Sequence, residues 1–374
     1  MQSPAPRPLH PLHPLHPLRP PRYPAPLRPG ARIAVTAPSS GVEPAHQARL
    51  DVVIAHLRAQ GFVVEEGRCL RSHRFDASAP AAERAAELMH FLLRDDIAAV
   101  FPPWGGELAI ELLPRLDWAA LAAAQPKWLI GFSDTSTLLL PLTLRLGWAT
   151  AHGPGLMDLA PSQHDALTTQ VMAHLATPTG GAFTQQSSTH WQRHWTDFAV
   201  DPQCSYRLTE ATAWRCLNRA EDDPTAWSLQ GRLLGGCLDT LMHLAGTPFG
   251  DVPRAVAADA ADAAGPRDGV LLYLENSDQD PVGLLRALTG LRLAGWFDGI
   301  RGLLLGRSAG PEATSPDALH AAMAVHQAVG DLPCPVIADA DIGHRPPQML
   351  LINGALASLQ RGADGSVRLT QTLA

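Results

Sequence analysis

Short apolar runs alternate with stretches of helical periodicity from residue 31 to residue 131. The run 31–41 ends in turn residues, and a helical pattern follows over 44–60. We predict the further strands at 62–66, 97–101 and 128–131 and the further helices at 80–93, 108–113 and 118–124. Strands that alternate with helices form a parallel, doubly wound sheet, and such sheets bind ligands beyond the carboxyl ends of their strands.

A change of composition divides the chain after this region. Residues 177–224 are rich in Thr, Ser, Gln, Gly and Trp and have no clear periodicity. Beyond them we predict a strand at 269–274, which ends at Glu275, a helix at 281–293 and a strand at 300–305, and we expect apolar segments at 336–338 and 349–352 to close the fold. We also predict a strand at 213–217 and a glycine-rich turn and helix at 233–245. The expected parts are a tail at 1–22, a nucleophile-bearing domain at 23–176, a linker with mobile loops at 177–225 and a second domain at 226–374.

The amino-terminal tail repeats Pro-Leu-His three times, and the first thirty residues of the chain hold eleven of its 34 prolines. Proline donates no backbone hydrogen bond, so such a run favours polyproline II or disorder over helix or sheet. His10, His13 and His16 could bind a metal weakly, but a flexible tail is the better interpretation of this composition.

Charge and cysteine content exclude several classes of protein. The formal net charge is −7, and the first thirty residues hold four arginines and no acid, so the rest of the chain carries −11. This argues against nucleic acid as a partner, because nucleic-acid binding depends on neutralising phosphates. The five scattered cysteines fit reduced thiols in a cytoplasmic protein, and no segment resembles a membrane span or a signal peptide.

Ser133 lies between a predicted strand and a predicted helix, in the segment Gly131-Phe-Ser-Asp-Thr135. A sharp turn at this place exposes the hydroxyl, as in the nucleophile elbow of G-x-S-x-G hydrolases. The pattern is half present, because Thr135 replaces the second glycine. A serine followed by an aspartate at the start of a helix is also a common helix cap, so Ser133 alone leaves both interpretations open.

Other residues that could carry chemistry lie in predicted loops or at strand ends. The amides of Trp104-Gly-Gly-Glu107 could converge on an oxyanion near Ser133, or the segment could be only a tight turn. Glu275 ends an apolar strand, where an unpaired carboxylate would be costly, so we expect it to have a definite partner. His344 lies in a loop between strands. No spacing argument connects Glu275 or His344 to Ser133.

Taken together, these stretches resemble the LD-carboxypeptidase family of serine peptidases, which includes muramoyl-tetrapeptide carboxypeptidases and the enzymes of microcin C self-immunity. The resemblance covers residues 24–360. It rests on an ordered set of motifs: Ile33-Ala-Val-Thr-Ala-Pro-Ser-Ser-Gly41, Gly105-Gly106, Leu112-Leu-Pro-Arg-Leu-Asp117, Pro126-Lys-Trp-Leu-Ile-Gly-Phe-Ser-Asp134, His152-Gly-Pro154, Leu234-Gly-Gly236, Gly246-Thr-Pro248, Leu274-Glu275 and Gly343-His344.

The resemblance implies a catalytic triad and a fold. Ser133 would be the nucleophile, His344 the general base and Glu275 the carboxylate that orients it, with the backbone amides of Gly106 and Asp134 as the oxyanion hole. Such a triad activates a serine hydroxyl that is otherwise a poor nucleophile at neutral pH. The implied fold is an α/β fold, with an amino-terminal Rossmann-like parallel sheet and a carboxyl-terminal mixed α/β domain, commonly in a homodimer. No cofactor is implied, and no metal-ligand spacing such as HExxH occurs.

The chain departs from the peptidoglycan-recycling branch around the glycine pair. Trp104-Gly-Gly-Glu-Leu108 stands where that branch reads Arg-Gly-Gly-Tyr-Gly, so Trp104 and Glu107 are candidate substrate-binding residues. Arg345, directly after His344, is a third. Microcin-type relatives use an aromatic side chain in a loop to stack on a nucleotide-like group, which Trp191, Trp195 or Trp214 could do here, although core tryptophans are the more common case.

Four functions remain open at this point. The first is hydrolysis of an amide bond in a small, muropeptide-like peptide. The second is cleavage of an aminoacyl or peptidyl nucleotide conjugate. The third is hydrolysis of an unrelated cytosolic ester or amide, and the fourth is the binding of a small ligand without catalysis.

Overall fold

The computed structural model describes residues 20–220, 227–261, 268–315 and 317–374. Most of the predicted tail therefore lies outside the described residues. Of its last three residues, Arg22 is anchored: its backbone N–H donates to the carbonyl oxygen of Gly147 at 2.6 Å, and its guanidinium donates to the carbonyl oxygens of Ala122 and Ala124.

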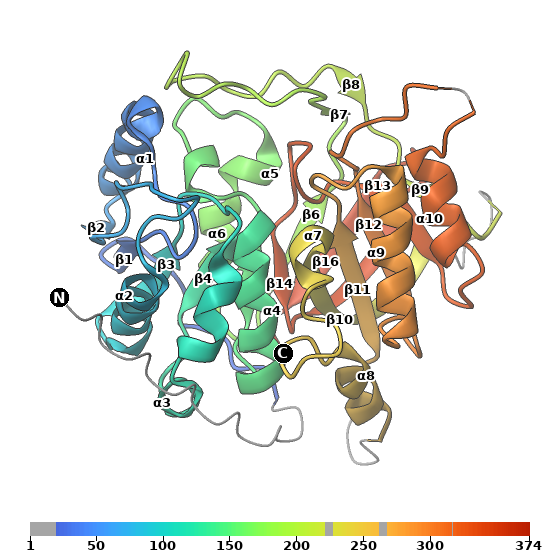
Figure 1. Cartoon of the computed structure of the whole chain (residues 1–374), viewed down its shortest axis with the longest axis horizontal. Helices are drawn as coiled ribbons and strands as arrows, with labels where there is room; N and C mark the ends of the chain where they lie inside the picture. Colours follow the sequence, from blue (N-terminus) through green and yellow to red (C-terminus); the bar gives the residue numbers. More distant parts are fainter. Residues whose placement is uncertain (1–19, 221–226, 262–267, 316) are drawn as a thin grey trace.

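The first sheet contains the predicted parallel strands and one strand from the far end of the chain (Figure 1). Its order is β14-β5-β4-β3-β1-β2, and only β14 runs antiparallel to its neighbour. The strands are β1 (Arg32–Val35), β2 (Val63–Glu66), β3 (Ile97–Phe101), β4 (Trp128–Gly131), β5 (Thr150–His152) and β14 (Leu351–Asn353).

Alternating side chains place helices on both faces of this sheet. Ile33 and Val35 pack with α1 (Gln47–Ala59) in one buried cluster, whereas Ala34 between them packs in another with α2 (Ala81–Leu93), α3 (Trp118–Ala123) and α4 (Ser136–Leu146). The predicted helix at 108–113 is a 3-10 helix, Ala109–Arg115, and the short helices α5 (Ala166–Thr169) and α6 (Val171–Leu175) follow β5. The amino-terminal half is the expected Rossmann-like domain.

The second sheet is mixed, as expected for the carboxyl-terminal domain. Its order is β6-β16-β15-β10-β11-β12-β13-β9, with parallel pairing from β10 to β13 and antiparallel pairing elsewhere. Its strands are β6 (Ala182–Gln186), β9 (Arg215–Cys216), β10 (Ser228–Cys237), β11 (Val270–Glu275), β12 (Gly302–Gly306), β13 (Val336–Ala340), β15 (Leu356–Arg361) and β16 (Val367–Thr372). Its helices are α7 (Leu238–Leu241), α8 (Val252–Ala261), α9 (Pro281–Leu293) and α10 (Ala321–Val329), and a separate hairpin joins β7 (His190–Trp191) to β8 (Glu210–Ala211).

The predicted glycine-rich turn and helix at 233–245 was right only over Leu238–Leu241, which is helical. Residues 233–237 belong to strand β10, and the helix begins at Leu238. A Cβ atom on Gly236 would lie 2.7 Å from the Cβ of Ser136, the first residue of α4. The glycines therefore allow a strand to pass close to a helix of the other domain and do not mark a turn.

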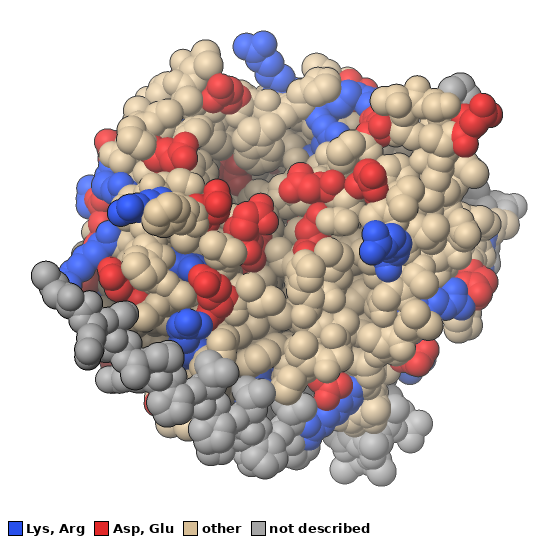
Figure 2. Space-filling view, viewed as in Figure 1, with Lys and Arg blue, Asp and Glu red and all other residues tan. Residues whose placement is uncertain are grey.

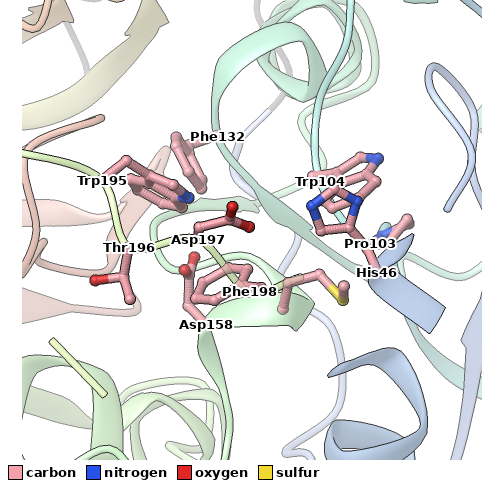
Figure 3. A pocket seen from close by; sticks show the side chains of 10 residues that line it. His46, Pro103, Trp104, Phe132, Asp158, Trp195, Thr196, Asp197 and Phe198 are labelled. Carbon is pink, nitrogen blue, oxygen red and sulfur yellow. The ribbon is translucent and has the colours of Figure 1, made fainter. Parts of the chain in front are cut away.

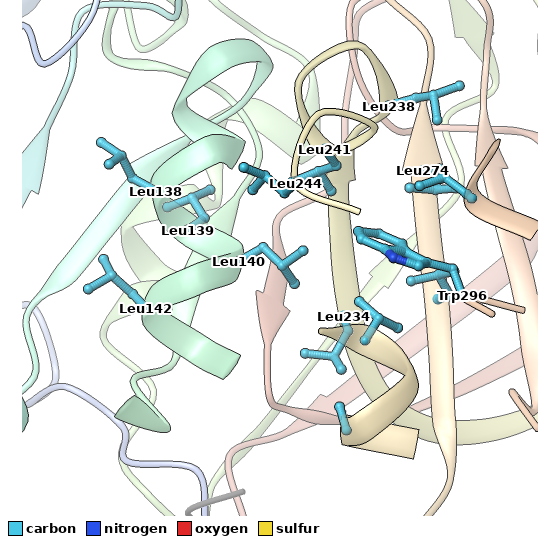
Figure 4. Packing of buried hydrophobic residues seen from close by; sticks show 14 of the residues in the cluster. Leu138, Leu139, Leu140, Leu142, Leu234, Leu238, Leu241, Leu244, Leu274 and Trp296 are labelled. Atoms are coloured by element: carbon cyan, nitrogen blue, oxygen red, sulfur yellow. The ribbon is translucent and has the colours of Figure 1, made fainter. Parts of the chain in front are cut away.

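A buried leucine cluster joins the two domains along this contact (Figure 4). Leu140 of α4 points toward the second domain, where Leu234 of β10 and Leu241 of α7 belong to the same cluster, and all three are buried. The carboxyl ends of β4 and β11 are thereby held next to each other, and the candidate site lies at these ends.

Candidate active site

Ser133 forms the turn between β4 and α4. Its φ of +56° places a residue other than glycine in the left-handed region, which costs about 1–2 kcal/mol. The residue lines a cavity of about 90 Å³ at the junction of the two domains. A strained strand-to-helix turn of this kind is also a feature of nucleophile elbows, and the role of Ser133 as a nucleophile stays a prediction.

Gly105 and Gly106 cross directly over this turn. A Cβ atom on Gly105 would lie 2.7 Å from the Cβ of Ser133 and 2.8 Å from the amide nitrogen of Asp134, so any larger residue would displace the loop. Gly106 has a φ of +135°, which favours glycine. Within the described part of the chain, the N–H groups of Gly106 and Asp134 donate to no protein acceptor. Two amides next to Ser133 are thus available to an anionic oxygen.

The carboxylate of Asp134 is used to hold the turn. It accepts hydrogen bonds from the Ser39 hydroxyl at 2.5 Å, from the Ala109 N–H at 2.8 Å and from the Thr137 hydroxyl at 3.0 Å. Burial raises the pKa of Asp134, and these hydrogen bonds oppose the shift. The side chain therefore connects three segments of the first domain, and only the backbone amide of Asp134 is left for a ligand.

The structure brings Glu275 and His344 together. Glu275 ends β11 with its side chain fully buried, and its Oε2 accepts a hydrogen bond from Nδ1 of His344 at 2.8 Å. Gly343 makes this approach possible, because a Cβ at that position would lie within 2.6 Å of the Glu275 carboxylate carbon. The ring of His344 also contacts that of Phe132, the residue before Ser133, with centroids 4.8 Å apart. No hydrogen bond joins Ser133 to His344 in the described part of the chain.

The pKa shifts of this pair follow from burial and from mutual attraction. Burial alone would lower the pKa of His344, but the negative charge of Glu275 and the hydrogen bond to it are stronger, and the pKa is raised above its usual value. Burial would raise the pKa of Glu275, but His344 outweighs this effect and the pKa is lowered. Glu275 is therefore ionised at neutral pH, and His344 holds its proton to a higher pH than a free histidine does.

Carboxylates line the cavity beside Ser133. Glu107, Asp239 and Asp278 all contribute to its wall, and acidic side chains gather near the centre of the face shown in Figure 2. Burial raises the pKa of Glu107, and nearby carboxylates, Asp134 and Asp278 first among them, raise it further. The cavity thus favours a cation over a second anion.

An aromatic cavity of about 210 Å³ is lined in part by Phe132, the residue before Ser133 (Figure 3). Trp195 and Phe132 face Trp104 and His46 across it, and Phe198 and Asp158 contribute to its floor. The indole N–H of Trp104 donates to the carbonyl oxygen of Ser40 at 3.1 Å. This cavity offers ring faces to a flat group bound next to Ser133.

The other candidate residues have different surroundings. Trp214 is buried and donates to Asp341 at 3.1 Å, as a core tryptophan would, and Trp191 packs with the guanidinium groups of Arg193 and Arg307. The guanidinium of Arg345 donates to the carbonyl oxygens of Ser308 and Ala309 at 3.3 and 3.5 Å. Of the predicted tryptophans, Trp104 and Trp195 line the aromatic cavity.

Sequence reasoning missed three residues around the site. His152 was quoted only as part of a motif, yet its fully buried ring lies next to Glu275. Phe132 lines the aromatic cavity and its ring contacts that of His344, and Asp341 holds the loop that carries His344. His152 and Phe132 had a signal, because each stands in a quoted motif, but nothing in the sequence connects these motifs to Glu275 or His344.

Among the described residues, one group of side chains could hold a metal ion: Cys237, Glu275 and His344, with ligand atoms within 4.8 Å of one another. The hydrogen bond between Glu275 and His344 already accounts for two of these three. No helix in the described ranges is long and apolar enough to cross a membrane.

Comparison with known families gives matches in both halves of the chain. Residues 33–153 match the family model of the LD-carboxypeptidase N-terminal domain, and residues 230–359 match that of the LD-carboxypeptidase C-terminal domain. A Streptomyces coelicolor protein named "Putative carboxypeptidase" is 33% identical over 86% of this chain and 87% of its own length.

Two solved structures share the fold. The structure of MccF in complex with glutamyl sulfamoyl guanosine matches with a TM-score of 0.76 at 21% identity, over 93% of this chain and 97% of its own. The muramoyltetrapeptide carboxypeptidase from Oxalobacter formigenes matches with a TM-score of 0.67 at 23% identity, over 91% and 99% of the two chains.

Proposed function

The chain belongs to the LD-carboxypeptidase family, and on that basis we propose that it is a serine hydrolase that cleaves an amide bond of a small peptide through an acyl-enzyme on Ser133. One observation carries the proposal. A buried carboxylate, Glu275, holds the His344 ring by one nitrogen, next to a serine on a strained turn with two free amides beside it.

In the proposed reaction, Nε2 of His344 takes the proton of the Ser133 hydroxyl as the oxygen attacks the substrate carbonyl carbon. The N–H groups of Gly106 and Asp134 bind the resulting oxyanion. The C–N bond then breaks, and His344 returns the proton to the leaving nitrogen. A water molecule then attacks the acyl carbon while His344 takes its proton, and the bond to the Ser133 oxygen breaks. His344 returns the proton to Ser133, and the free acid leaves. Glu275 stabilises the charged imidazole in both halves of the reaction.

The test is covalent labelling followed by turnover. A fluorophosphonate should label the protein at Ser133, and Ser133→Ala should abolish labelling and lower kcat about 10⁴-fold or more. Ser277→Ala is the matched control, because Ser277 lines the same cavity but is not on the strained turn. Retained turnover in Ser133→Ala, or labelling at another serine, would refute the serine mechanism.

A second candidate function is amide cleavage in an aminoacyl or peptidyl nucleotide conjugate. The aromatic cavity next to Phe132 supports it, because a purine could stack between Trp195 and Trp104. A hydrolysis screen that compares a muramoyl tetrapeptide with an aminoacyl-sulfamoyl adenosine distinguishes the two. Cleavage of the adenosine conjugate, with a loss of kcat/KM in Trp195→Ala, would favour the second candidate.

Homodimer formation and a cytoplasmic location are part of the same proposal. They rest on the family and on the scattered cysteines, all five of which are free thiols in the structure.

A further inference from the structure

A second imidazole lies against Glu275. His152 ends β5, where it pairs with Gly131 of β4 and Leu351 of β14, and its side chain is fully buried. Its Nε2 is 3.9 Å from Oε1 of Glu275, the carboxylate oxygen that His344 does not use. Neither nitrogen of His152 nor this oxygen has a hydrogen-bond partner in the described part of the chain.

Unpaired polar atoms at such depth need an explanation. An ionised carboxylate loses favourable hydration on burial, and His344 compensates only one of the two oxygens of Glu275. Burial lowers the pKa of His152 to about 4, although the charge of Glu275 opposes this shift. The ring is therefore neutral at pH 7, and the tautomer with its proton on Nε2 directs an N–H toward Oε1. A movement of about 1 Å brings the two atoms to hydrogen-bond distance.

We propose that His152 is a positioning residue of this site, whose neutral N–H stabilises the Glu275 carboxylate in the state where His344 has no extra proton. The inference rests on the proposed function. A protonated His344 and an ionised Glu275 form a pair with no net charge. Once His344 loses that proton, the pair holds one buried negative charge. An N–H that donates to Oε1 of Glu275, the oxygen that His344 does not use, stabilises that state. This is the state in which His344 can accept the proton of Ser133.

Two other neutral groups face this pair. Burial raises the pKa values of the Cys237 thiol on β10 and the Tyr273 hydroxyl on β11 well above their usual range, so both keep their protons. The Cys237 thiol is the competing donor: its hydrogen bond to Glu275 helps to lower the pKa of that carboxyl, but a thiol is a weak donor, and it also donates to Asp239 at 3.6 Å. Tyr273 donates to Asn353 at 2.9 Å. Asp239 and Asp278 act on His344 from the cavity side and raise its pKa whether or not His152 is present.

The experiment measures the proton affinity of His344 directly. In ¹⁵N-histidine NMR spectra, the Nδ1–H that bonds to Glu275 is identified by its loss in His344→Gln. In His152→Phe, which keeps a ring but no donor, we expect the pKa of His344 to rise by about one unit, a tenfold change in proton affinity. The acid limb of the kcat/KM profile should move up by the same amount, and His152→Gln, which retains an N–H, should restore most of the wild-type value.

Several results would overturn the proposal. The proposal fails if the pKa of His344 is unchanged in His152→Phe. It also fails if the pKa of His152 in the wild-type protein lies above 6.5, a measurement that needs no variant. If His152→Phe does not fold, His152→Leu takes its place. The NMR titration needs no substrate, so it is independent of turnover. A shifted His344 pKa with an unmoved acid limb would support the coupling and count against His344 as the general base.

Discussion

Glu107 and Asp278 are the carboxylates beside Ser133 whose charges are free to meet a ligand, and Glu107 directly follows the glycine pair. In the described part of the chain neither carboxylate makes a hydrogen bond or ion pair, whereas Asp239 accepts the N–H groups of Ser277 and Asp278 at 2.8 and 3.0 Å. An uncompensated carboxylate attracts an ammonium group and repels a carboxylate. We therefore expect the preferred substrate to carry a free amine near the scissile bond.

The prediction compares two substrates that differ only in whether this amine is free or acetylated. Glu107→Gln should lower kcat/KM for the free amine by about three- to tenfold and leave the acetylated substrate nearly unchanged. Glu83→Gln, an exposed substitution at the start of α2, should change neither value. If the ratio of the kcat/KM values for the two substrates is the same in Glu107→Gln as in the wild type, Glu107 does not determine the preference for a free amine.

At this scale the sequence identified side chains but not their partners. The strand-to-helix turn pointed to Ser133, and the depth of the apolar strand required a partner for Glu275. That the partner is His344, and that His152 lies on the other carboxylate oxygen, depends on contacts between residues 69 and 123 positions apart. Local patterns carry no information about such contacts.

Among the elements, the loop after β13 fixes the position of His344 through Asp341. This fully buried carboxylate accepts hydrogen bonds from the N–H and hydroxyl of Ser188, the indole of Trp214 and the guanidinium of Arg307. It therefore connects the loop of His344 to the segment between β6 and β9. We infer that the order of this segment and the position of His344 are coupled.

Replacing Asp341 tests this coupling. Asp341→Asn leaves the Arg307 guanidinium buried without its countercharge, which should lower the free energy of unfolding by about 3–5 kcal/mol. Because His344 would also be displaced, kcat should fall, and the loss in kcat/KM should exceed any rise in KM. Asp339→Asn is the matched control two residues away, because its ion pair with Arg215 is exposed at the surface and should be worth about 0–1 kcal/mol. Equal effects of the two substitutions on thermal unfolding would contradict the assignment.

Elements with local signals were predicted well. Helix α9 begins at Pro281 after the cap Asp280, whose carboxylate accepts the Gly283 N–H at 2.7 Å, and its predicted bounds are the observed ones. The segment 233–237 was misread because glycine usually marks a turn, whereas here it permits contact with α4. The pairing of β14 with β5 joins residues about 200 positions apart, and no local pattern could indicate it.

At the scale of the whole molecule, the proposed triad is divided between two sheets. Ser133 follows a strand of the first sheet, while Glu275 ends one strand of the second sheet and His344 follows another. The hydrophobic cluster between the sheets is continuous: it contains Leu129 of β4 and Leu140 of α4 as well as residues of β10, β11 and β12. The two domains therefore share one core, and the geometry of the site depends on it.

A shared core predicts that the protein unfolds in one step. Far-UV circular dichroism, tryptophan fluorescence and hydrolytic activity should be lost at the same urea concentration. Leu140→Ala removes a fully buried side chain between the sheets and should lower the free energy of unfolding by about 2–5 kcal/mol, moving all three curves together. Leu293→Ala, at a position 85% exposed, should change it by less than about 0.5 kcal/mol. Two separate transitions, with activity lost in the first, would show instead that each domain is stable alone and that the site forms only by their docking.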